Sequence, residues 1–249
     1  PLWQAKKKCP NLQVIPPNQK QYLYFSRLAR SIYADYTDFI ESFGIDEAWL
    51  DVSASTNLYG NGQKIADTIR QRMKEELGLT CSIGISYNKV FAKLGSDYKK
   101  PDATTLIDKN NYKKIAWPLP VDALLYVGPA TCKKLALFNI HTIGLLAQAN
   151  LSILKQNFGK SGETIWNFAN GLDQSPVRNI HLEQTIKSVG NSVTTPRDLQ
   201  KLQDVEIVFT ILAQSIAARL REHNLKSNVV QISIRNNQLL TINRQATLP

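Results

Sequence analysis

Residues 39–53 contain two short apolar runs that meet at a pair of adjacent acids, Asp46 and Glu47. The runs are rich in residues that favour strands, so the segment predicts two short antiparallel strands with the acids where they meet. Ile45 and Ala48–Leu50 are expected to press the acids against a β-rich core, where uncompensated negative charge is costly. A divalent metal ion would offset that cost. A solvated turn between two strands is the alternative explanation.

The charge balance favours a polyanionic partner. The 249 residues include 30 Lys and Arg against 20 Asp and Glu, which gives a net charge of +10 at pH 7. We expect nucleic acid, because no apolar run approaches the roughly 20 residues of a membrane span and no amphipathic helix concentrates the cations. A generically basic protein is the alternative. The three cysteines and three histidines lack metal-ligand spacing, and reduced cysteines are typical of the cytosol.

The first part of the chain alternates helices and strands. Apolar residues at helical spacing predict a helix before Gly78, which is expected to cap its C-terminus. Together with the strand pair at the acids, the alternation predicts an α+β sheet with helices on one face. The predicted helices are 19–36, 62–77 and 88–98, and the further strands are 80–86 and 104–107.

The pattern changes twice further along the chain. Trp117–Pro118–Leu119–Pro120 is a stiff break that is followed by short helices alone, which predicts a small all-helical domain. After a second boundary near 174–176, a strand, a long helix and a hairpin around Asn236 are expected. The short helices are 121–125, 131–137, 142–148, 151–158 and 162–170; the later elements are strand 186–195, helix 201–224 and strands 229–234 and 239–242.

One helix against three strands would leave a sheet edge that further residues normally cover. The chain also begins at Pro1 without an initiator Met. We therefore expect a fragment of a longer protein.

A tight glycine turn, with the sequence LYVGPAT at 125–131, opens one of the short helices. The backbone N–H groups of Val127 and Gly128 are expected to be free and to bind a DNA phosphate with help from the helix dipole, while Lys133 and Lys134 add charge. A turn with a purely structural role explains the same residues. The net charge favours DNA.

Residues 86–102, SYNKVFAKLGSDYKKPD, form a strand, a lysine-bearing helix and a Lys-Lys-Pro turn. Taken with 44–51, GIDEAWLD, they resemble the palm of the Y-family DNA polymerases, the translesion enzymes, and in particular the bacterial DNA polymerase IV (DinB-like) branch. The resemblance extends over essentially the whole chain.

The resemblance implies a multidomain α+β fold. Its parts are a ferredoxin-like palm that lacks its first strand, an all-helical helix-hairpin-helix thumb and a partial α+β little finger. The implied boundaries are 1–14 for the end of the fingers, 15–117 for the palm, 118–178 for the thumb and 179–249 for the little finger.

The implied activity is template-directed addition of dNMP to a primer 3′ end opposite damaged template, with two Mg²⁺ ions. Asp46 matches a metal-binding acid, and Glu47 matches the acid that holds the ion nearer the primer. Lys100 matches a lysine that contacts the incoming triphosphate. Lys187 and Ser188 match the entry to the little finger and are expected to join the thumb residues in binding DNA.

The resemblance also implies partners and a compartment. Primer-template DNA and dNTP are the expected substrates, and a sliding clamp is an expected partner through a C-terminal segment. We expect a monomer in the bacterial cytoplasm with no membrane association. Lys93 is expected to support the sheet or contact phosphate loosely, and Asp51 and Asp97 are expected to be structural.

Two departures from the family pattern matter. The third metal-binding carboxylate of the family precedes the first residue of this chain, so residues 1–249 alone are expected to be inactive or nearly so. Tyr126 replaces the first glycine of the thumb Gly-x-Gly pattern, which favours a looser phosphate contact. Gly44 and Trp49 replace the usual Ser and the usual Tyr or Phe, and both are expected to be tolerated.

Two rival functions remain open. One is a DNA-binding module in which the acids are vestigial. The other is a nucleotide cyclase of similar palm topology, which also uses paired acids and two metals; the thumb-like domain and the charge of +10 disfavour it.

Overall fold

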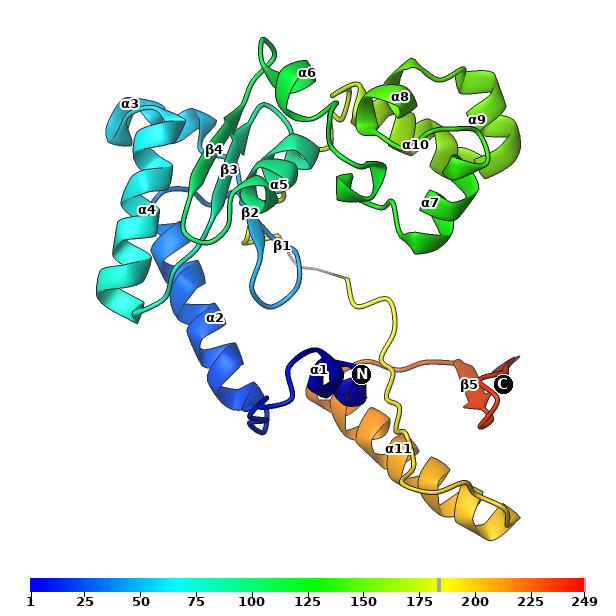
Figure 1. Cartoon of the computed structure of the whole chain (residues 1–249). Coiled ribbons are helices and arrows are strands. Elements are labelled where there is room, and N and C mark those ends of the chain that lie inside the picture. The colour runs from blue at the N-terminus through cyan, green and yellow to red at the C-terminus, as the bar shows by residue number, and fades with distance from the viewer. Residues whose placement is uncertain (183–184, 249) are drawn as a thin grey trace. The chain divides into compact units, whose positions relative to one another are not determined.

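The computed structural model describes residues 1–182 and 185–248 and divides into two compact units. The first unit is Pro1–Leu182 and the second is Glu183–Pro249. The first unit contains the predicted acid pair and the predicted thumb, and its elements are labelled in Figure 1.

Four short strands form two separate ladders in the first unit. Strands β1 (Ile40–Ser42) and β2 (Ala48–Leu50) pair in antiparallel register, so the predicted hairpin at the acids is confirmed. Strands β3 (Ile83–Ser86) and β4 (Thr104–Ile107) pair in parallel. Strand β4 has its predicted bounds, whereas β3 begins three residues after the predicted start at 80.

Three longer helices form where they were predicted, because each has an asparagine at its start. The side chains of Asn18, Asn61 and Asn88 accept hydrogen bonds from backbone N–H groups of the first turn. Gly78 ends the second of them with φ +64°, a left-handed conformation that glycine adopts at little cost. These helices are α2 (Gln19–Ala34), α4 (Gly62–Leu77) and α5 (Lys89–Tyr98). Short helices that were not predicted are α1 (Leu2–Lys8), η1 (Ser53–Ser55), α3 (Thr56–Tyr59) and α6 (Tyr112–Ile115).

Helices cover both faces of the β3–β4 ladder (Figure 1), so the prediction of helices on one face alone is wrong. Side chains alternate along a strand, and Ile83 packs into the cluster that α2 and α4 build around Ile65 and Ile69. Gly84 points the other way, toward α5. A Cβ atom at Gly84 would lie 1.8 Å from the carbonyl oxygen of Ala92, so the missing side chain lets the helix backbone approach the strand.

The predicted all-helical region is confirmed, and its core is continuous with α5. Buried Phe91 and Leu94 of α5 belong to the same cluster as the buried leucines and isoleucines of the short helices. One predicted helix, 121–125, is only a 3₁₀ turn. The elements are η2 (Val121–Ala123), α7 (Pro129–Ala136), α8 (Ile143–Gln148), α9 (Leu151–Phe158) and α10 (Lys160–Ala169).

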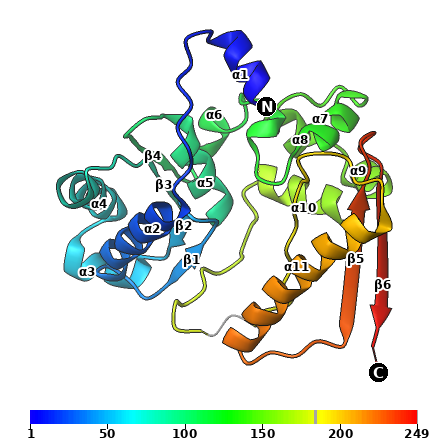
Figure 2. The same cartoon turned by 90° about the horizontal axis from the view of Figure 1, so that it is seen from below.

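The second unit contains the predicted long helix and hairpin (Figure 2). They are α11 (Leu202–Glu222), β5 (Val229–Arg235) and β6 (Thr241–Thr247), and no residue of these three elements is buried. The strand predicted at 186–195 does not form. Asn191 instead donates a hydrogen bond to Ser215 Oγ, and Arg219 donates one to the Gly190 carbonyl, so this segment bonds to α11 and not to a strand.

Across residues 1–182 and 185–248, no helix has both the length and the apolar character that crossing a bilayer requires.

Candidate active site

The two predicted acids lie at the tip of the β1–β2 hairpin. The N–H of Phe43 donates to the carbonyl of Glu47 at 2.9 Å and closes the turn. Asp46 is exposed and Glu47 is half-buried. Ile45, which lies in the turn between β1 and the two acids, keeps 37% of its surface exposed. The expectation that Ile45 presses the acids against a core is therefore wrong, because the tip of the hairpin faces solvent.

Helix α2 holds the backbone of this tip. The hydroxyl of Ser26, a buried side chain, donates to the carbonyl of Ile45, and Arg30 Nη2 donates to the carbonyl of Gly44 at 3.2 Å. Gly44 has φ +83°, in the region that favours glycine, so it suits the turn better than the serine usual in the family. The backbone of the acid pair is thus fixed while its carboxylates stay accessible. Sequence reasoning missed both contacts, since Ser26 and Ile45 are 19 residues apart.

A chain of alternating charges leads away from Glu47 along α5. Lys93 Nζ lies 2.9 Å from Glu47 Oε1 and 2.6 Å from Asp97 Oδ2, and the other oxygen of Asp97 lies 2.7 Å from Lys100 Nζ. Burial lowers the pKa of Lys93, but the hydrogen bonds that it donates to Asp97 and Glu47 raise the pKa above its ordinary value. Burial raises the pKa of Asp97, and the bonds from Lys100 and Lys93 reverse that effect and hold it below its ordinary value. Lys93 and Asp97 are therefore both charged at neutral pH.

This chain connects the predicted metal-binding acid to the predicted triphosphate-binding lysine. Lys93 and Asp97, which were expected to support the sheet and to be structural, are the two links between them. Helical spacing in the sequence could have suggested the Lys93–Asp97 pair. Lys93 and Glu47 are 46 positions apart in the sequence, so no local sequence pattern predicts their contact.

A shallow, open cleft of about 470 Å³ lies next to this charge chain in the first unit. Lys93 and Asp97 line it together with residues 122–128 of the predicted thumb. The glycine turn of the thumb and the charge chain of α5 therefore face a common space.

The glycine turn has open space at Gly128, but one of its two predicted free amides is already hydrogen-bonded. Gly128 precedes α7, and nothing lies within 4 Å of the position that a Cβ atom would take there. Val127 is buried, and its N–H donates to the carbonyl of Leu124 at 3.1 Å, so the expectation of a free amide is wrong for Val127. Tyr126 has φ +67°, so the backbone keeps a left-handed conformation here even without glycine.

The basic residues predicted to bind DNA differ in their surroundings. Lys134 Nζ donates to the carbonyl of Asn157 and lies 4.8 Å from the centre of the Phe158 ring. Lys133 is exposed on the same helix. Lys187 and Ser188 are exposed in the second unit, in an irregular segment that precedes α11.

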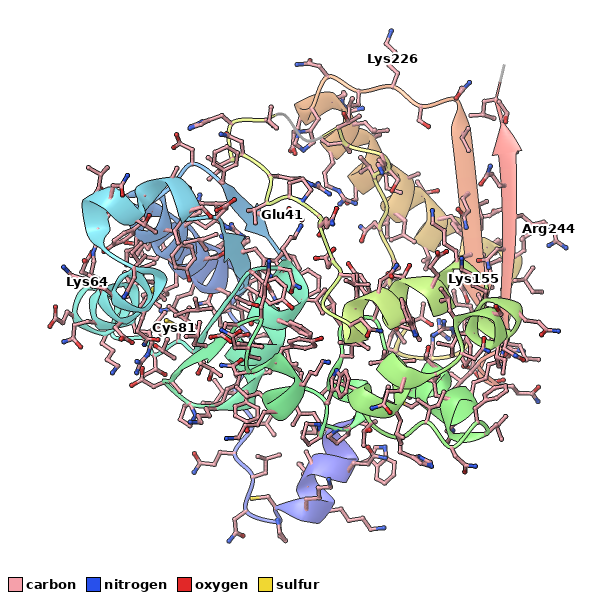
Figure 3. The ribbon with its side chains drawn as sticks, turned by 90° about the horizontal axis from the view of Figure 1, so that it is seen from above. Glu41, Lys64, Cys81, Lys155, Lys226 and Arg244 are labelled. Carbon is pink, nitrogen blue, oxygen red and sulfur yellow. The ribbon has the colours of Figure 1, made fainter. Side chains whose placement is uncertain are left out.

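Glu41 of β1, which is labelled in Figure 3, binds the segment that follows the thumb to the hairpin. Its carboxylate, which is 12% exposed, lies 2.8 Å from Lys89 Nζ and accepts a hydrogen bond from the N–H of Arg178 at 3.1 Å. Lys89 also lies over the Trp49 ring, whose Nε1 donates to the Lys89 carbonyl at 2.9 Å. The aromatic residue of the acid motif is thereby held against the start of α5.

The acid pair fits a divalent metal ion by donor chemistry. Asp46 and Glu47 offer carboxylate oxygens, and Mg²⁺ is usually held by one or two carboxylates together with water and substrate phosphates. Among the residues that the structure describes, no cluster of three or more His, Cys, Asp or Glu side chains is present. Two adjacent carboxylates are a number that suits an ion whose coordination is completed by water and substrate.

Solved structures share this architecture. A Y-family DNA polymerase chimera, Dbh-Dpo4(243-245)-Dbh, superimposes with a TM-score of 0.86 at 21% identity, over 100% of this chain and 71% of that chain. DinB from Sulfolobus solfataricus gives a TM-score of 0.65 at 22% identity, over 100% of this chain and 72% of that chain. The fold is therefore the mixed α+β fold of Y-family DNA polymerases, as predicted.

Three family models match the sequence. Residues 1–97 match the impB/mucB/samB family, 186–249 match its C-terminal domain, and 124–173 match a model described as the DNA polymerase-iota thumb domain. Residues 1–97 and 186–249, which together make up more than half of the chain, therefore belong to the impB/mucB/samB family.

Curated relatives have more sequence in common with the chain. It is 56% identical to DNA polymerase IV of Acetivibrio thermocellus over 99% of its own length and 62% of that protein. It is 40% identical to DNA polymerase IV 1 of Bacillus subtilis over 100% of its own length and 59% of that protein. The chain thus spans about 60% of the length of these relatives.

Proposed function

We propose that the natural full-length protein is a translesion DNA polymerase that adds dNMP to a primer 3′ end opposite damaged template. The observation that carries this proposal is the acid pair at the hairpin tip, where Glu47 is linked through Lys93 and Asp97 to Lys100 beside a cleft that the thumb turn also lines. The DNA polymerase IV relatives support it.

In this proposal Asp46 and Glu47 hold two Mg²⁺ ions. When bound, such ions lower the pKa of the primer 3′-hydroxyl and neutralise the pyrophosphate leaving group. Both residues lie at the tip of the hairpin, and α2 fixes the backbone beside them. Lys100 carries a compact ammonium on a turn and contacts the triphosphate of the incoming dNTP.

Binding of primer-template DNA rests on phosphate contacts. The open backbone at Gly128 and the ammonium groups of Lys133, Lys134 and Lys187 are suited to phosphate, with Ser188 as a neutral donor. Val127 contributes to DNA binding only indirectly, because its buried side chain supports the turn from the core. Such contacts predict an affinity that depends on salt and not on base sequence.

The reaction is tested by incubating the natural full-length protein with Mg²⁺, dNTP and either a primer-template or no DNA. Extension of the primer by the templated nucleotide, including opposite an abasic site, is the expected result. Cyclic nucleotide formed without DNA would establish the cyclase alternative. DNA binding with no product under any metal would establish the binding-module alternative.

Three finer points complete the proposal. The protein acts as a monomer, binds a sliding clamp through sequence beyond the polymerase domains, and works in the bacterial cytoplasm. That residues 1–249 alone extend a primer poorly stays a prediction. It is checked by comparing their extension rate with that of the full-length protein, and equal rates would contradict it.

A further inference from the structure

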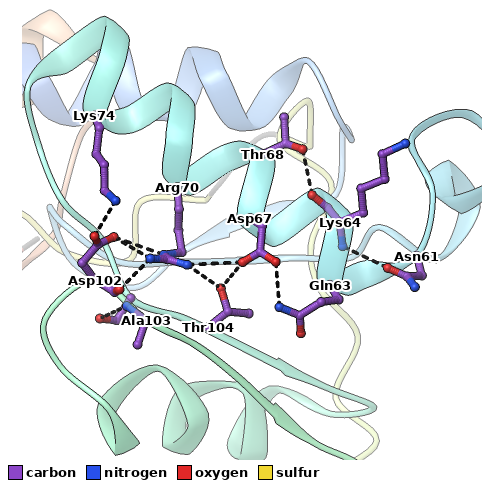
Figure 4. A network of polar contacts seen from close by, with 11 residues as sticks. Asn61, Gln63, Lys64, Asp67, Thr68, Arg70, Lys74, Asp102, Ala103 and Thr104 are labelled. Atoms are coloured by element: carbon purple, nitrogen blue, oxygen red, sulfur yellow. Dashed lines mark hydrogen bonds and ion pairs between the residues drawn. The ribbon is translucent and has the colours of Figure 1, made fainter.

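Helix α4 holds the turn that contains Asp102 (Figure 4). Arg70 Nη2 donates to the main-chain carbonyl of Asp102 at 2.6 Å and to its Oδ1 at 2.8 Å. Lys74 Nζ lies 2.5 Å from the other carboxylate oxygen. One residue of the turn is therefore bound through both its backbone and its side chain, two positions after Lys100.

The guanidinium of Arg70 is itself oriented. Its Nη1 donates to Thr104 Oγ1 at 3.2 Å and to Asp67 Oδ1 at 3.3 Å, and Thr104 Oγ1 donates to the same Asp67 oxygen at 2.6 Å. The Arg70 side chain is only 19% exposed. A planar donor fixed on three sides restricts its partner to one orientation, which a flexible ammonium does not do.

The conformation of Asp102 shows why the turn needs such a contact. Its φ is +55°, in the left-handed region, where residues other than glycine persist only when their surroundings hold them. The bonds from Lys74 and Arg70 hold the pKa of this carboxyl below its usual range, so the contact is ionic at neutral pH.

The side chain of Lys100 has a weaker anchor of its own. Its ammonium lies 2.7 Å from Asp97, but 56% of the side chain is exposed, and an exposed ion pair fixes a long side chain poorly. The direction in which Lys100 leaves the turn is therefore set by the backbone, and α4 holds that backbone.

We propose that Arg70 is a positioning residue for nucleotide binding: by holding Asp102, it sets the direction in which the turn presents Lys100 to the triphosphate. This inference rests on the proposed function of Lys100. A contact made equally in the ground state and the transition state changes KM and leaves kcat unchanged. Loss of Arg70 should therefore raise the KM for dNTP.

Arg72 on the same helix is the matched control. It forms ion pairs of similar kind, to Glu76 at 2.5 Å and to Asp35 at 2.7 Å, and it is 27% exposed. Its partners lie away from the turn, so Arg72→Met removes an arginine from α4 without touching Asp102.

The experiment measures single-nucleotide incorporation by the natural full-length protein and by variants carrying Arg70→Met, Arg72→Met, Lys100→Ala, or both Arg70→Met and Lys100→Ala. We expect Lys100→Ala to raise the KM for dNTP about tenfold or more and Arg70→Met to raise it about 3- to 10-fold, with kcat within about twofold. Added to Lys100→Ala, Arg70→Met should change KM by less than about twofold, because both act on one contact. Arg72→Met should leave KM unchanged.

The experiment distinguishes failure of this inference from failure of the proposed function of Lys100. An unchanged KM in Lys100→Ala contradicts the proposed function of Lys100 and, with it, this inference. A raised KM in Lys100→Ala beside an unchanged KM in Arg70→Met overturns the inference alone, as does an equal rise in Arg72→Met or full additivity in the double variant. If Arg70→Met does not fold, Asp102→Asn replaces it, since asparagine tolerates the left-handed region. A KM that stays unchanged in Asp102→Asn overturns the inference.

Discussion

Lys133 and Lys134 show how neighbouring residues of one type differ in what they can do. Sequence reasoning treated the two lysines alike, because both follow the glycine turn. In the fold, Lys134 is engaged by the Asn157 carbonyl and the Phe158 ring, and Lys133 faces solvent. An ammonium group that must give up existing contacts gains less free energy when it binds a phosphate.

We therefore predict that Lys133→Ala weakens DNA binding more than Lys134→Ala does. Each phosphate contact that is lost should reduce the slope of log K against log salt by about 0.9, and Lys134→Ala should reduce it by less. Fluorescence anisotropy with a labelled primer-template, measured between about 50 and 200 mM salt, gives both slopes. Equal changes in the two variants would contradict this difference.

The residues of the site were predictable to different degrees. Asp46 and Glu47 are adjacent and flanked by strand formers, so a local pattern reveals them. The contact of Lys93 with Glu47 and that of Arg70 with Asp102 join residues 46 and 32 positions apart, and only the packing of helices against the sheet brings these pairs together. Exposure was also misjudged, since apolar neighbours such as Ile45 do not bury a hairpin tip.

At the scale of elements, Gly84 determines how α5 lies on the sheet. A Cβ at this position would also come within 2.5 Å of the Ser96 backbone nitrogen, so α5 would have to move away from β3. Because α5 carries Lys93 and Asp97, that movement would also displace the link to Glu47.

We predict that Gly84→Ala destabilises the first unit by about 3 kcal/mol or more, at or beyond the upper end of ordinary overpacking, because the clash is with backbone atoms. Gly78→Ala is the control. It places a Cβ in open space at φ +64° and should cost about 1 kcal/mol. Urea unfolding followed by tryptophan fluorescence compares the two, since all four tryptophans lie in the first unit. A cost at Gly84 no larger than that at Gly78 would contradict the proposed close approach.

The elements were predictable where a local signal marked their ends. Gly78 marked the end of α4, and the asparagine caps that the structure shows at Asn61 and Asn88 are local signals of the same kind. The strand predicted at 186–195 failed because β-formers such as Ile186 and Val189 do not reveal whether a neighbouring strand is there to pair with, and this segment bonds to α11. The close packing of α5 on its face of β3–β4 depends on Gly84, and the apolar periodicity of the sequence gives no information about a residue that has no side chain.

At the scale of the whole molecule, acidic side chains bind basic ones in several places. Asp102, Asp97 and Glu41 each hold a pKa below the ordinary value: hydrogen bonds from Lys74 and Arg70 lower that of Asp102, and in Asp97 and Glu41 the bonds from lysine outweigh an opposing effect of burial. A carboxyl whose pKa is lower in the folded state stabilises the fold above its unfolded pKa, and this stability is lost as the pH falls through the folded pKa.

We therefore predict that the free energy of unfolding of the first unit is nearly constant from pH 7 to about pH 5 and falls below about pH 4. Glu41→Gln should flatten this fall, because it removes one of the carboxyls that must be protonated. Urea titrations at a series of pH values measure both. Stability that rises on acidification, or an identical fall in Glu41→Gln, would contradict the assignment.

The central claim is that Asp46 and Glu47 hold the metal ions of a nucleotidyl transfer site. Its most direct test is the rate of single-nucleotide incorporation by the natural full-length protein carrying Asp46→Asn or Glu47→Gln, with Asp51→Asn as the control, since Asp51 Oδ1 accepts a bond from the Ser53 N–H beyond β2. The first two should lower the rate at least about a thousandfold, or about 4 kcal/mol, with primer-template affinity retained, and Asp51→Asn should stay within about tenfold of wild type. Rates within tenfold of wild type for Asp46→Asn and Glu47→Gln would contradict the claim.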